Sequence, residues 1–570
     1  MYLAYTLRRI AFTKCRMSIS QCFNKINRLK NVCLVKANAM KRLLLLFSLL
    51  TSGLLAQTDS LNVSFRSHYI YPGHACANIC GYVDSTGREY ALVGVDNGMS
   101  VVDVTNPSTP FEVYQVMWPV QNSNSEWKEI KVYKKHAYVV SEAGSGLQIV
   151  DLSKLPATTT PTVTYWTPMV SGQTLSRVHA LHIDTTKGNI YLYGSNLGNK
   201  GAIIGSLANP ASPVYLGRYN GAYVHDGYVD NDTLYACEIY NGYLKIINCT
   251  NKTSPAVLAT VQTPLVFTHN SWLTPDKKTI FTTDEVSQSS LTSYDISDIS
   301  NITLLDTIKG LTTGSIVHNV HVTKDLFAVT SWYRDGFTIV DVSRPSNLIT
   351  VGYYDSYAGG GDGFNGDWGV YPFLPSGTIV ASYIEDGLYV YTPTYKRACF
   401  LEGNVKDSVT DANLQNVTAT IISSPGSTFS DVLGMYATGC AGAGIYNVQF
   451  SKSGYQSKII NGVTLTNGTV TTLDTKLMPL GNGVAQLQNN NTFFKVDNTL
   501  FEGKTNLSYY LSNEEACSSV LKVYDYSGNI IFERKLQSQN GEIALGEDWS
   551  AGVYLITING VKPLKVIKSK

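Results

Sequence analysis

The stretch Tyr90-Ala91-Leu92-Val93-Gly94, followed by Gly98-Met99-Ser100-Val101-Val102-Asp103-Val104, decides the fold. It reads as two short apolar strands joined by a tight turn, and the second strand opens with glycine and ends at an aspartate. The same pattern returns in six later segments, at 137–152, 190–204, 234–248, 280–295, 326–341 and 378–391. The chain therefore contains seven copies of one internal repeat.

A repeat of roughly 40–50 residues with several strands per unit is typical of a β-propeller. One small sheet cannot cover both of its faces, so neighbouring sheets have to stack radially and bury each other. We therefore predict an all-β chain, with a seven-bladed β-propeller over 62–395 followed by two small β-sandwich domains. A parallel β-helix is the main rival, although its rungs are usually shorter and more regular.

Residues 1–56 hold ten of the 44 Lys and Arg residues and no Asp or Glu. Within them, Met40-Lys41-Arg42 precedes the apolar run 43–50 and small residues up to Ala56, which predicts a signal peptide over 40–56. The run is too short for an anchor, so we expect no transmembrane span in the mature chain. Residues 1–39 are interpreted as a mis-assigned upstream extension, with a genuine basic leader as the alternative.

Beyond residue 56 the chain carries 34 basic against 43 acidic residues. A mildly acidic chain offers no cationic surface, so no nucleic-acid partner is expected. It also contains no G-x-S-x-G, H-E-x-x-H or P-loop motif to support nucleophilic or phosphate chemistry. Seven cysteines remain, of which Cys399 and Cys440 could form a disulfide, or all could be small buried apolar residues.

The repeats resemble LVIVD-type propeller repeats, and the order of local motifs resembles the choice-of-anchor B family of secreted bacterial proteins. The residues that carry the resemblance are Trp127-Lys128-Glu129-Ile130-Lys131-Val132, Tyr223-Val224-His225-Asp226, Phe267-Thr268-His269-Asn270-Ser271-Trp272, Val317-His318-Asn319 and Asp367-Trp368-Gly369-Val370-Tyr371-Pro372. The resemblance covers about 62–395 and implies a propeller fold and export, but no particular enzymatic activity.

Alternating strands and glycine turns over 399–479, such as Tyr446-Asn447-Val448-Gln449-Phe450 before Gly454, resemble a carboxypeptidase regulatory-like (transthyretin-like) module. The stretch 480–494 has the composition of a linker. Residues 495–570, with Ser550-Ala551-Gly552-Val553-Tyr554 and the basic end Lys565-Val566-Ile567-Lys568, resemble the type IX secretion system C-terminal sorting domain of Bacteroidetes. That resemblance implies the type IX machinery as a partner and a secreted or outer-membrane surface location on a Gram-negative bacterium.

Histidine is scarce, yet four of the nine recur at one point of the repeat: His179, His225, His269 and His318. Each lies four residues before an apolar strand position. The same spacing puts Ile79, Lys128 and Asp367 at this point in the other repeats. A common position in consecutive blades predicts a common radius near the axial channel. Imidazoles gathered there could hold a divalent metal, with His225, His269 and His318 as the first ligands and Asp226, Asp284, Glu285 or Asp367 as oxygen donors.

A structural role is the alternative for each of these residues. Histidines at a channel mouth can simply satisfy backbone groups, and ligands in separate blades can lie too far apart for one ion. His182 and His321 could face the packing between blades. Trp127, Trp272, Trp332 and Trp368 could stack on a ligand, although large aromatic residues are mostly core. The four aspartates that end strands are expected to cap turns, namely Asp103, Asp151, Asp295 and Asp341.

The sequence therefore favours an exported surface protein that binds a glycan, peptide or protein without catalysis, with His179, His225, Asp226, His269, His318 and Trp368 as candidate ligand-binding residues. The competing hypothesis is a metal-assisted hydrolase or lyase that uses the histidine-lined mouth. The two differ in whether a metal or an acid/base pair converges there.

Overall fold

The computed structural model describes residues 59–122, 126–359, 361–480, 493–511, 519–558 and 563–569. The expected signal peptide, the segment before it and most of the expected linker lie outside these residues. Strands dominate the described chain, in which the one helix is the short 3₁₀ turn η1 (Tyr333–Asp335). The prediction of an all-β chain is confirmed. No helix in the described part reaches the length and apolarity that crossing a membrane requires.

The described residues between 60 and 393 form seven antiparallel sheets, and each of the first six is built on four strands that follow one another in sequence. The first three sheets are β3(Cys76–Val83) β4(Glu89–Val95) β5(Gly98–Asp103) β6(Phe111–Met117), then β7(Lys128–Tyr133) β8(His136–Ser141) β9(Leu147–Asp151) β10(Val163–Trp166), then β13(Ala180–Asp184) β14(Asn189–Tyr193) β15(Ala202–Ser206) β16(Val214–Tyr219). A two-stranded ribbon, β11(Met169–Val170) and β12(Gln173–Thr174), lies between the second and third sheets.

The next three sheets are β17(Asp226–Asp230) β18(Thr233–Glu238) β19(Tyr243–Asn248) β20(Ala256–Gln262), then β21(Thr268–Leu273) β22(Thr279–Asp284) β23(Leu291–Asp295) β24(Thr303–Ile308), then β25(Val317–Val322) β26(Phe327–Trp332) β27(Gly336–Asp341) β28(Ile349–Tyr354) with β1(Ser60–Leu61) at its edge. Their antiparallel pairing excludes the parallel β-helix.

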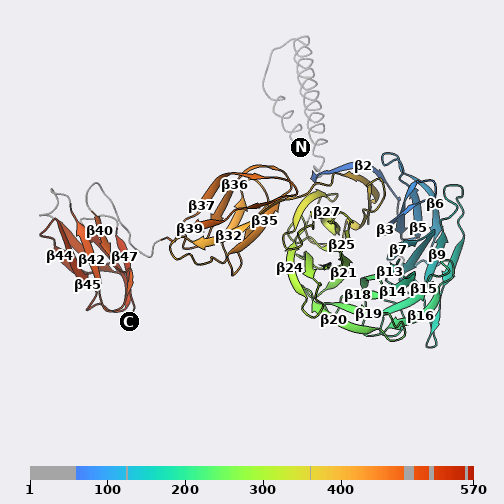
Figure 1. The fold of residues 1–570 in the computed structure, drawn as a ribbon, viewed down its shortest axis with the longest axis horizontal. Helices are drawn as coiled ribbons and strands as arrows, with labels where there is room; N and C mark the ends of the chain where they lie inside the picture. The colour runs from blue at the N-terminus through green and yellow to red at the C-terminus, as the bar shows by residue number, and fades with distance from the viewer. Residues whose placement is uncertain are drawn as a thin grey trace, which may run out of the picture.

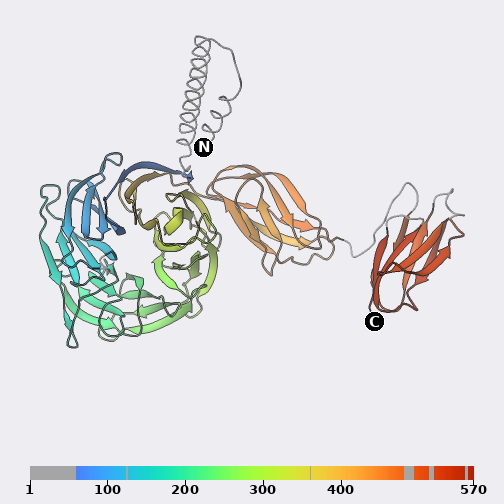
Figure 2. The same cartoon turned by 180° about the vertical axis from the view of Figure 1, so that it is seen from behind.

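The seventh sheet joins the two ends of this region. It contains β29(Asp367–Tyr371), β30(Ile379–Tyr383) and β31(Gly387–Pro393), and its outer strand is β2(Val63–Tyr69) from the beginning of the described chain. Val63 pairs with Pro393 and Tyr69 with Leu388, and Figure 2 shows β2 reaching across to the late strands.

The seven sheets stand around a common axis (Figure 1). The first strand of each sheet contacts the first strand of the next, and β29 contacts β3, so the contacts run once around and close. Apolar side chains from adjacent sheets fill the space between them, as Leu92 and Val101 do against Ile130 and Val139. The arrangement is propeller-like and buries the inner strand of every sheet.

The turns that end the third strands repeat as expected. A side-chain oxygen accepts the backbone N–H two residues on, over 2.8–3.2 Å, in six of the seven repeats: Asp103, Asp151, Ser206, Asn248, Asp295 and Asp341. The prediction that the four aspartates cap turns is confirmed. They are structural residues and take no part in the site described below.

Residues 399–477 form two further sheets over one core that includes Val405, Val417 and Phe450. Their strands are β32(Cys399–Asp407), β33(Thr418–Ile421), β34(Ser427–Phe429), β35(Met435–Cys440), β36(Gly444–Ser451), β37(Lys458–Leu465), β38(Val470–Thr472) and β39(Thr475–Leu477). Cys399 and Cys440 stand opposite each other on β32 and β35, and both are free thiols, so the disulfide expected as one alternative is not formed in this structure.

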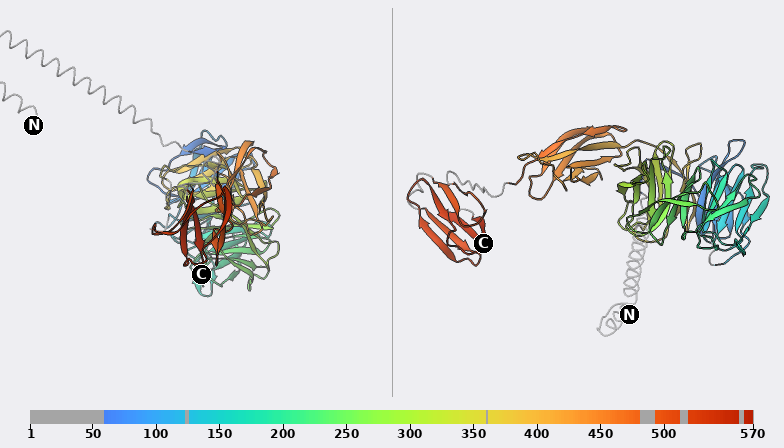
Figure 3. Two further views of the ribbon diagram at one scale, coloured as in Figure 1. Left: turned by 90° about the vertical axis from the view of Figure 1, so that its left-hand side faces the viewer. Right: turned by 60° about the horizontal axis from the view of Figure 1, so that its bottom comes forward.

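A last unit, red in Figure 3, packs two sheets over a second core that includes Phe494, Leu521 and Ile556. Its strands are β40(Phe493–Val496), β41(Leu500–Phe501), β42(Thr505–Tyr510), β43(Val520–Asp525), β44(Ile530–Lys535), β45(Asn540–Leu545), β46(Gly552–Ile558) and β47(Leu564–Lys568).

Candidate functional site

The four repeated histidines lie together at one mouth of the ring. Alternate residues of an inner strand face the axis, so equivalent residues of neighbouring sheets form a layer. Ring centroids are 3.9 Å apart for His179 and His225, 4.7 Å for His225 and His269, and 4.4 Å for His269 and His318. We call these four residues the imidazole cluster.

Backbone bulges place two members of the cluster. The pairing register of β21 shifts around His269, and that of β25 shifts around His318. The same shift in β29 places Trp368 beside His318, with 4.8 Å between ring centroids. Trp127 packs on Trp368 at another 4.8 Å and extends the row of rings around the mouth.

The sequence alignment of Asp367 with the histidines is wrong by one residue, because the bulge at Trp368 moves the register. Both carboxylate oxygens of Asp367 are buried with no hydrogen-bond partner among the described residues, and burial raises its pKa well above the usual value. Burial and, to a smaller extent, the Asp367 carboxylate raise the pKa of Tyr389 and of Tyr391.

Two carboxylates bracket the imidazole cluster. At one end, Oε1 of Glu142 lies 2.6 Å from Nδ1 of His179, whose Nε2 lies 3.0 Å from Nε2 of His225. At the other end, Glu285 lies between His269 and His318, with oxygen-to-Nε2 distances of 3.7 and 3.8 Å. One ligand atom each from His225, His269 and Glu285 lie within 4.8 Å of one another.

Neighbouring groups hold these side chains in place. The hydroxyl of Tyr333 donates to Oε1 of Glu285 over 2.6 Å. Nδ1 of His318 donates to the backbone carbonyl of Trp368, also over 2.6 Å. The hydroxyl of Tyr223 lies 3.1 Å from Nδ1 of His225. These contacts fix the orientation of each ring, as outer partners do for the side chains of many metal and catalytic sites.

Burial and neighbouring charges give the four imidazoles different pKa values. It lowers the pKa of His269 and of His318 to about 3, and that of His225 well below its usual value, with neighbouring imidazoles adding to the effect. Burial also acts on His179, but the hydrogen bond and charge of Glu142 outweigh it and raise the pKa. Three rings are therefore neutral around pH 7 and offer lone pairs.

Asp226 lies one layer deeper, under the cluster. Its Oδ2 accepts a 2.7 Å hydrogen bond from Asn270. Burial, together with the charge of Glu129, raises its pKa to about 6. Glu129 in turn accepts hydrogen bonds from Asn78 and Lys131. The predicted oxygen donor Asp226 thus belongs to a polar layer in the middle of the channel, and Asp284 is held elsewhere by Thr263 and backbone N–H groups.

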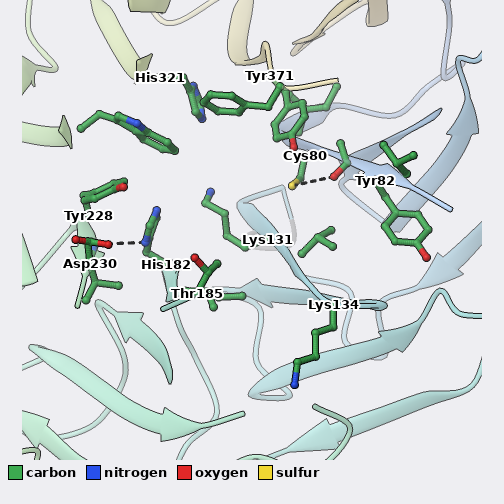
Figure 4. A pocket seen from close by; sticks show the side chains of 18 residues that line it. Cys80, Tyr82, Lys131, Lys134, His182, Thr185, Tyr228, Asp230, His321 and Tyr371 are labelled. Atoms are coloured by element: carbon green, nitrogen blue, oxygen red, sulfur yellow. Dashed lines mark hydrogen bonds between the residues drawn. The ribbon is translucent and has the colours of Figure 1, made fainter. Parts of the chain in front are cut away.

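The opposite mouth opens into a cavity of about 540 Å³. Its innermost residues, which include one from each of the seven inner strands, are Cys80, Lys131, His182, Tyr228, Trp272, His321 and Tyr371. Figure 4 shows the Lys131 side chain extending into this space, with His182 and Tyr228 on one side and His321 and Tyr371 on another. Trp272 lies 4.7 Å from His321 and 4.9 Å from Tyr228 by ring centroid.

The four tryptophans divide between the two expected roles, core packing and contact with a ligand. Trp332 is core, being 1% exposed. Trp127 and Trp368 line the histidine mouth, and Trp272 lines the cavity of the other mouth. His182 and His321 face that cavity as well, rather than the packing between sheets.

Sequence reasoning named Glu285 only as one of several oxygen donors and missed Glu142 and Tyr333. A signal was present, because these residues occupy one repeat position, next to the residue of the second strand that pairs at the mouth. An acid stands there in three of the seven repeats, namely Asp96, Glu142 and Glu285. Aligning second strands as well as histidines would have revealed it.

Comparison with known proteins finds the repeat itself. Three segments, 88–117, 127–159 and 332–356, match the family model described as the LVIVD repeat. They cover the second to fourth strands of the first sheet, the first three strands of the second sheet and the last two strands of the sixth. No curated protein matches the chain. The chain carries LVIVD repeats within a propeller-like, all-β fold.

Proposed function

We propose that this protein is an exported, non-catalytic binding protein whose ring of sheets is a seven-bladed β-propeller. The cyclic contacts between inner strands and the closing strand β2 support the propeller. The order of blade motifs, from Trp127 to Trp368, supports a place near the choice-of-anchor B family.

The two smaller units are proposed as accessories of export and spacing. The 399–479 unit corresponds to a carboxypeptidase regulatory-like sandwich, and the last unit to a type IX sorting domain that the secretion machinery recognises. Deletion of 495–570 should then leave the protein in the periplasm of a type IX-competent host, while wild type reaches the surface or the medium. Fractionation and immunoblotting measure this, and surface delivery of the truncated chain would contradict it.

The cavity at the Trp272 mouth carries the binding proposal. It combines aromatic faces with hydrogen-bonding groups on a rigid, pre-formed wall, which is the usual make-up of a ligand site. Trp272 and Tyr371 offer flat apolar surfaces for the C–H face of a sugar ring. Lys131, His182 and His321 line the same space and suit sugar hydroxyls. We therefore take a glycan as the ligand.

A glycan array probed with the labelled mature protein, followed by calorimetry on the hits, tests this function. Trp272→Ala should weaken binding roughly five- to tenfold, since stacking on one aromatic side chain is worth about 1–1.5 kcal/mol. Tyr240→Ala is the matched control, because Tyr240 is an exposed aromatic residue beside Tyr223 at the other mouth. Equal binding by both variants, or no hit on the array, would overturn the proposal.

A metal-assisted hydrolase or lyase is the second candidate, and the grouping of His225, His269 and Glu285 favours it. Three ligands with an open position are the usual set of a catalytic zinc. Metal-dependent turnover of a carbohydrate or peptide substrate, lost in Glu285→Gln, would favour this candidate over simple binding.

A further inference from the structure

In the space between His269, His318 and Glu285, an imidazole lone pair faces a carboxylate. Nδ1 of His318 faces the Trp368 carbonyl at 2.6 Å, and a carbonyl can only accept, so Nδ1 carries the ring proton. In the neutral ring, Nε2 is then a bare lone pair. This lone pair points at the Glu285 carboxylate, 3.8 Å away.

His269 faces the same carboxylate. Its Nε2 lies 3.7 Å from Oε2 of Glu285, beyond ordinary hydrogen-bond length. Its Nδ1 is buried without a hydrogen-bond partner among the described residues. Both His269 and His318 are 3% exposed, so bulk water does not supply the missing donors. Burying the bare Nε2 of His318 against the Glu285 carboxylate costs free energy that a cation between them would offset.

The spacing fits one small ion. Zinc binds imidazole nitrogen and carboxylate oxygen at ~2.0–2.2 Å, which places neighbouring ligand atoms of a tetrahedral site roughly 3.4 Å apart. The two distances to Glu285 exceed this by a few tenths of an ångström. Ligand atoms of His225, His269 and Glu285 lie within 4.8 Å of one another, and the Nε2 of His225, now 3.0 Å from that of His179, would have to turn toward the ion. Tyr333 and the Trp368 carbonyl hold Glu285 and His318 from outside, as second-shell partners do.

We propose that His225, His269, His318 and Glu285 form a binding site for one divalent transition-metal ion of the zinc type. Imidazole with a single carboxylate suits Zn²⁺, Ni²⁺ or Cu²⁺ rather than Ca²⁺ or Mg²⁺, which take mainly oxygen ligands. The site lies at the opposite mouth from the proposed glycan cavity, so the inference does not depend on glycan binding. His179, held by Glu142, stands beside His225 and completes the wall.

The test is Zn²⁺ binding by the chelator-treated mature protein. Calorimetry and metal analysis after gel filtration should give one Zn²⁺ per chain. Glu285→Gln keeps the size of the side chain and its hydrogen bond from Tyr333 but removes the charge, so its affinity should fall about 100-fold or more, the upper end of what even outer partners cost. Co²⁺ should give the visible bands of a four-coordinate site in wild type, and these should vanish in His269→Ala.

His321→Ala is the matched control. His321 follows His318 by three residues on β25, is equally buried, and lines the other mouth. It should keep wild-type Zn²⁺ affinity within twofold. Equal affinity in wild type and Glu285→Gln, or an equal loss in His321→Ala, would overturn the metal site. Since the glycan array needs no added metal, either proposal can fail while the other stands.

Discussion

Lys131 and Glu129 form an ion pair inside the channel, two residues apart on β7. Burial acts against the ammonium, but the charges of Glu129 and Asp226 outweigh it, and the pKa of Lys131 is raised. A pair of this kind contributes little compared with well-packed apolar residues, yet losing one partner leaves the other charge buried and alone. Lys131 therefore depends on Glu129 to reach into the cavity.

Glu129→Gln should destabilise the ring by roughly 3 kcal/mol, because the ammonium loses its partner. The double variant Glu129→Gln/Lys131→Met should recover most of that loss, since no charge remains unpaired. Urea unfolding followed by tryptophan fluorescence measures both. If the two variants lose the same amount, the pair is not coupled.

His182 makes the stability of the ring depend on pH. Burial, with a smaller effect from Lys131, lowers its pKa to about 3 in the folded chain, against about 6.5 when unfolded. Below pH 6.5 the unfolded state thus binds a proton at His182, whereas the folded state binds it only near pH 3. This contribution to stability is fully present above pH 6.5 and is lost as the pH falls.

We therefore expect the free energy of unfolding to fall from pH 7 to pH 5, and to fall less in His182→Gln, whose amide oxygen can still accept the hydrogen bond from Val229. Urea titrations at both pH values measure the difference. Identical falls in the two proteins would show that His182 is not the source.

The repeated hairpin of the second and third strands can be predicted from sequence, because each of its parts follows a local rule. Alternation and glycine turns predict the second and third strands, and the aspartates at strand ends predict their turns. The first strands were harder, since a bulge adds a residue without changing the sequence pattern. The spacing to the next apolar residue therefore predicts a common position for His269 and His318 but puts Asp367 where Trp368 lies.

The cavity depends on closure of the ring, which no local pattern encodes. Lys131 and Trp272 come from sheets that are far apart in sequence, and only the common axis brings them to one wall. The repeat position thus predicts one shared mouth for His179, His225, His269 and His318. The cavity at the opposite mouth could not be derived from the sequence.

The turn aspartates should differ in their cost of removal. Asp295 accepts the backbone N–H of Ser297, whereas Asp341 accepts from Ser343, Arg397 and the N–H of Ala398. Asp295→Ala should cost about 1 kcal/mol and Asp341→Ala roughly 3 kcal/mol, because the latter leaves buried donors unpaired. Denaturant unfolding compares them, and equal costs would contradict the extra role of Asp341.

At the scale of the whole molecule, the ring and the 399–477 unit are tied by specific contacts. Arg344 makes a two-pronged contact with Glu402, at 2.7 and 2.6 Å. Asn347 donates to the carbonyl of Thr438 over 3.0 Å, and Phe400 packs with the apolar core of the last sheets of the ring. The junction combines charge with apolar burial.

Closure by β2 leads to a prediction at the same scale. Deleting residues 57–71 removes β1 and β2, which leaves an unpaired edge on β31 and uncovers the core around Phe337 and Tyr391. The melting temperature of the ring should fall by several degrees, whereas deleting 493–570 should leave it unchanged. Calorimetry measures both, and equal effects would mean that β2 does not close the ring.

The pairing of Val63 with Pro393 has a consequence for the order of events during synthesis. Contacts between the two ends of a long segment form late, because the intervening chain must first be brought to order. Six sheets can assemble in order as the chain is synthesised. The seventh needs β2 from the beginning of the ring and β29, β30 and β31 from its end. Until then the protein is an open arc of six sheets, and the pairing of β2 with β31 is the last step that completes the ring.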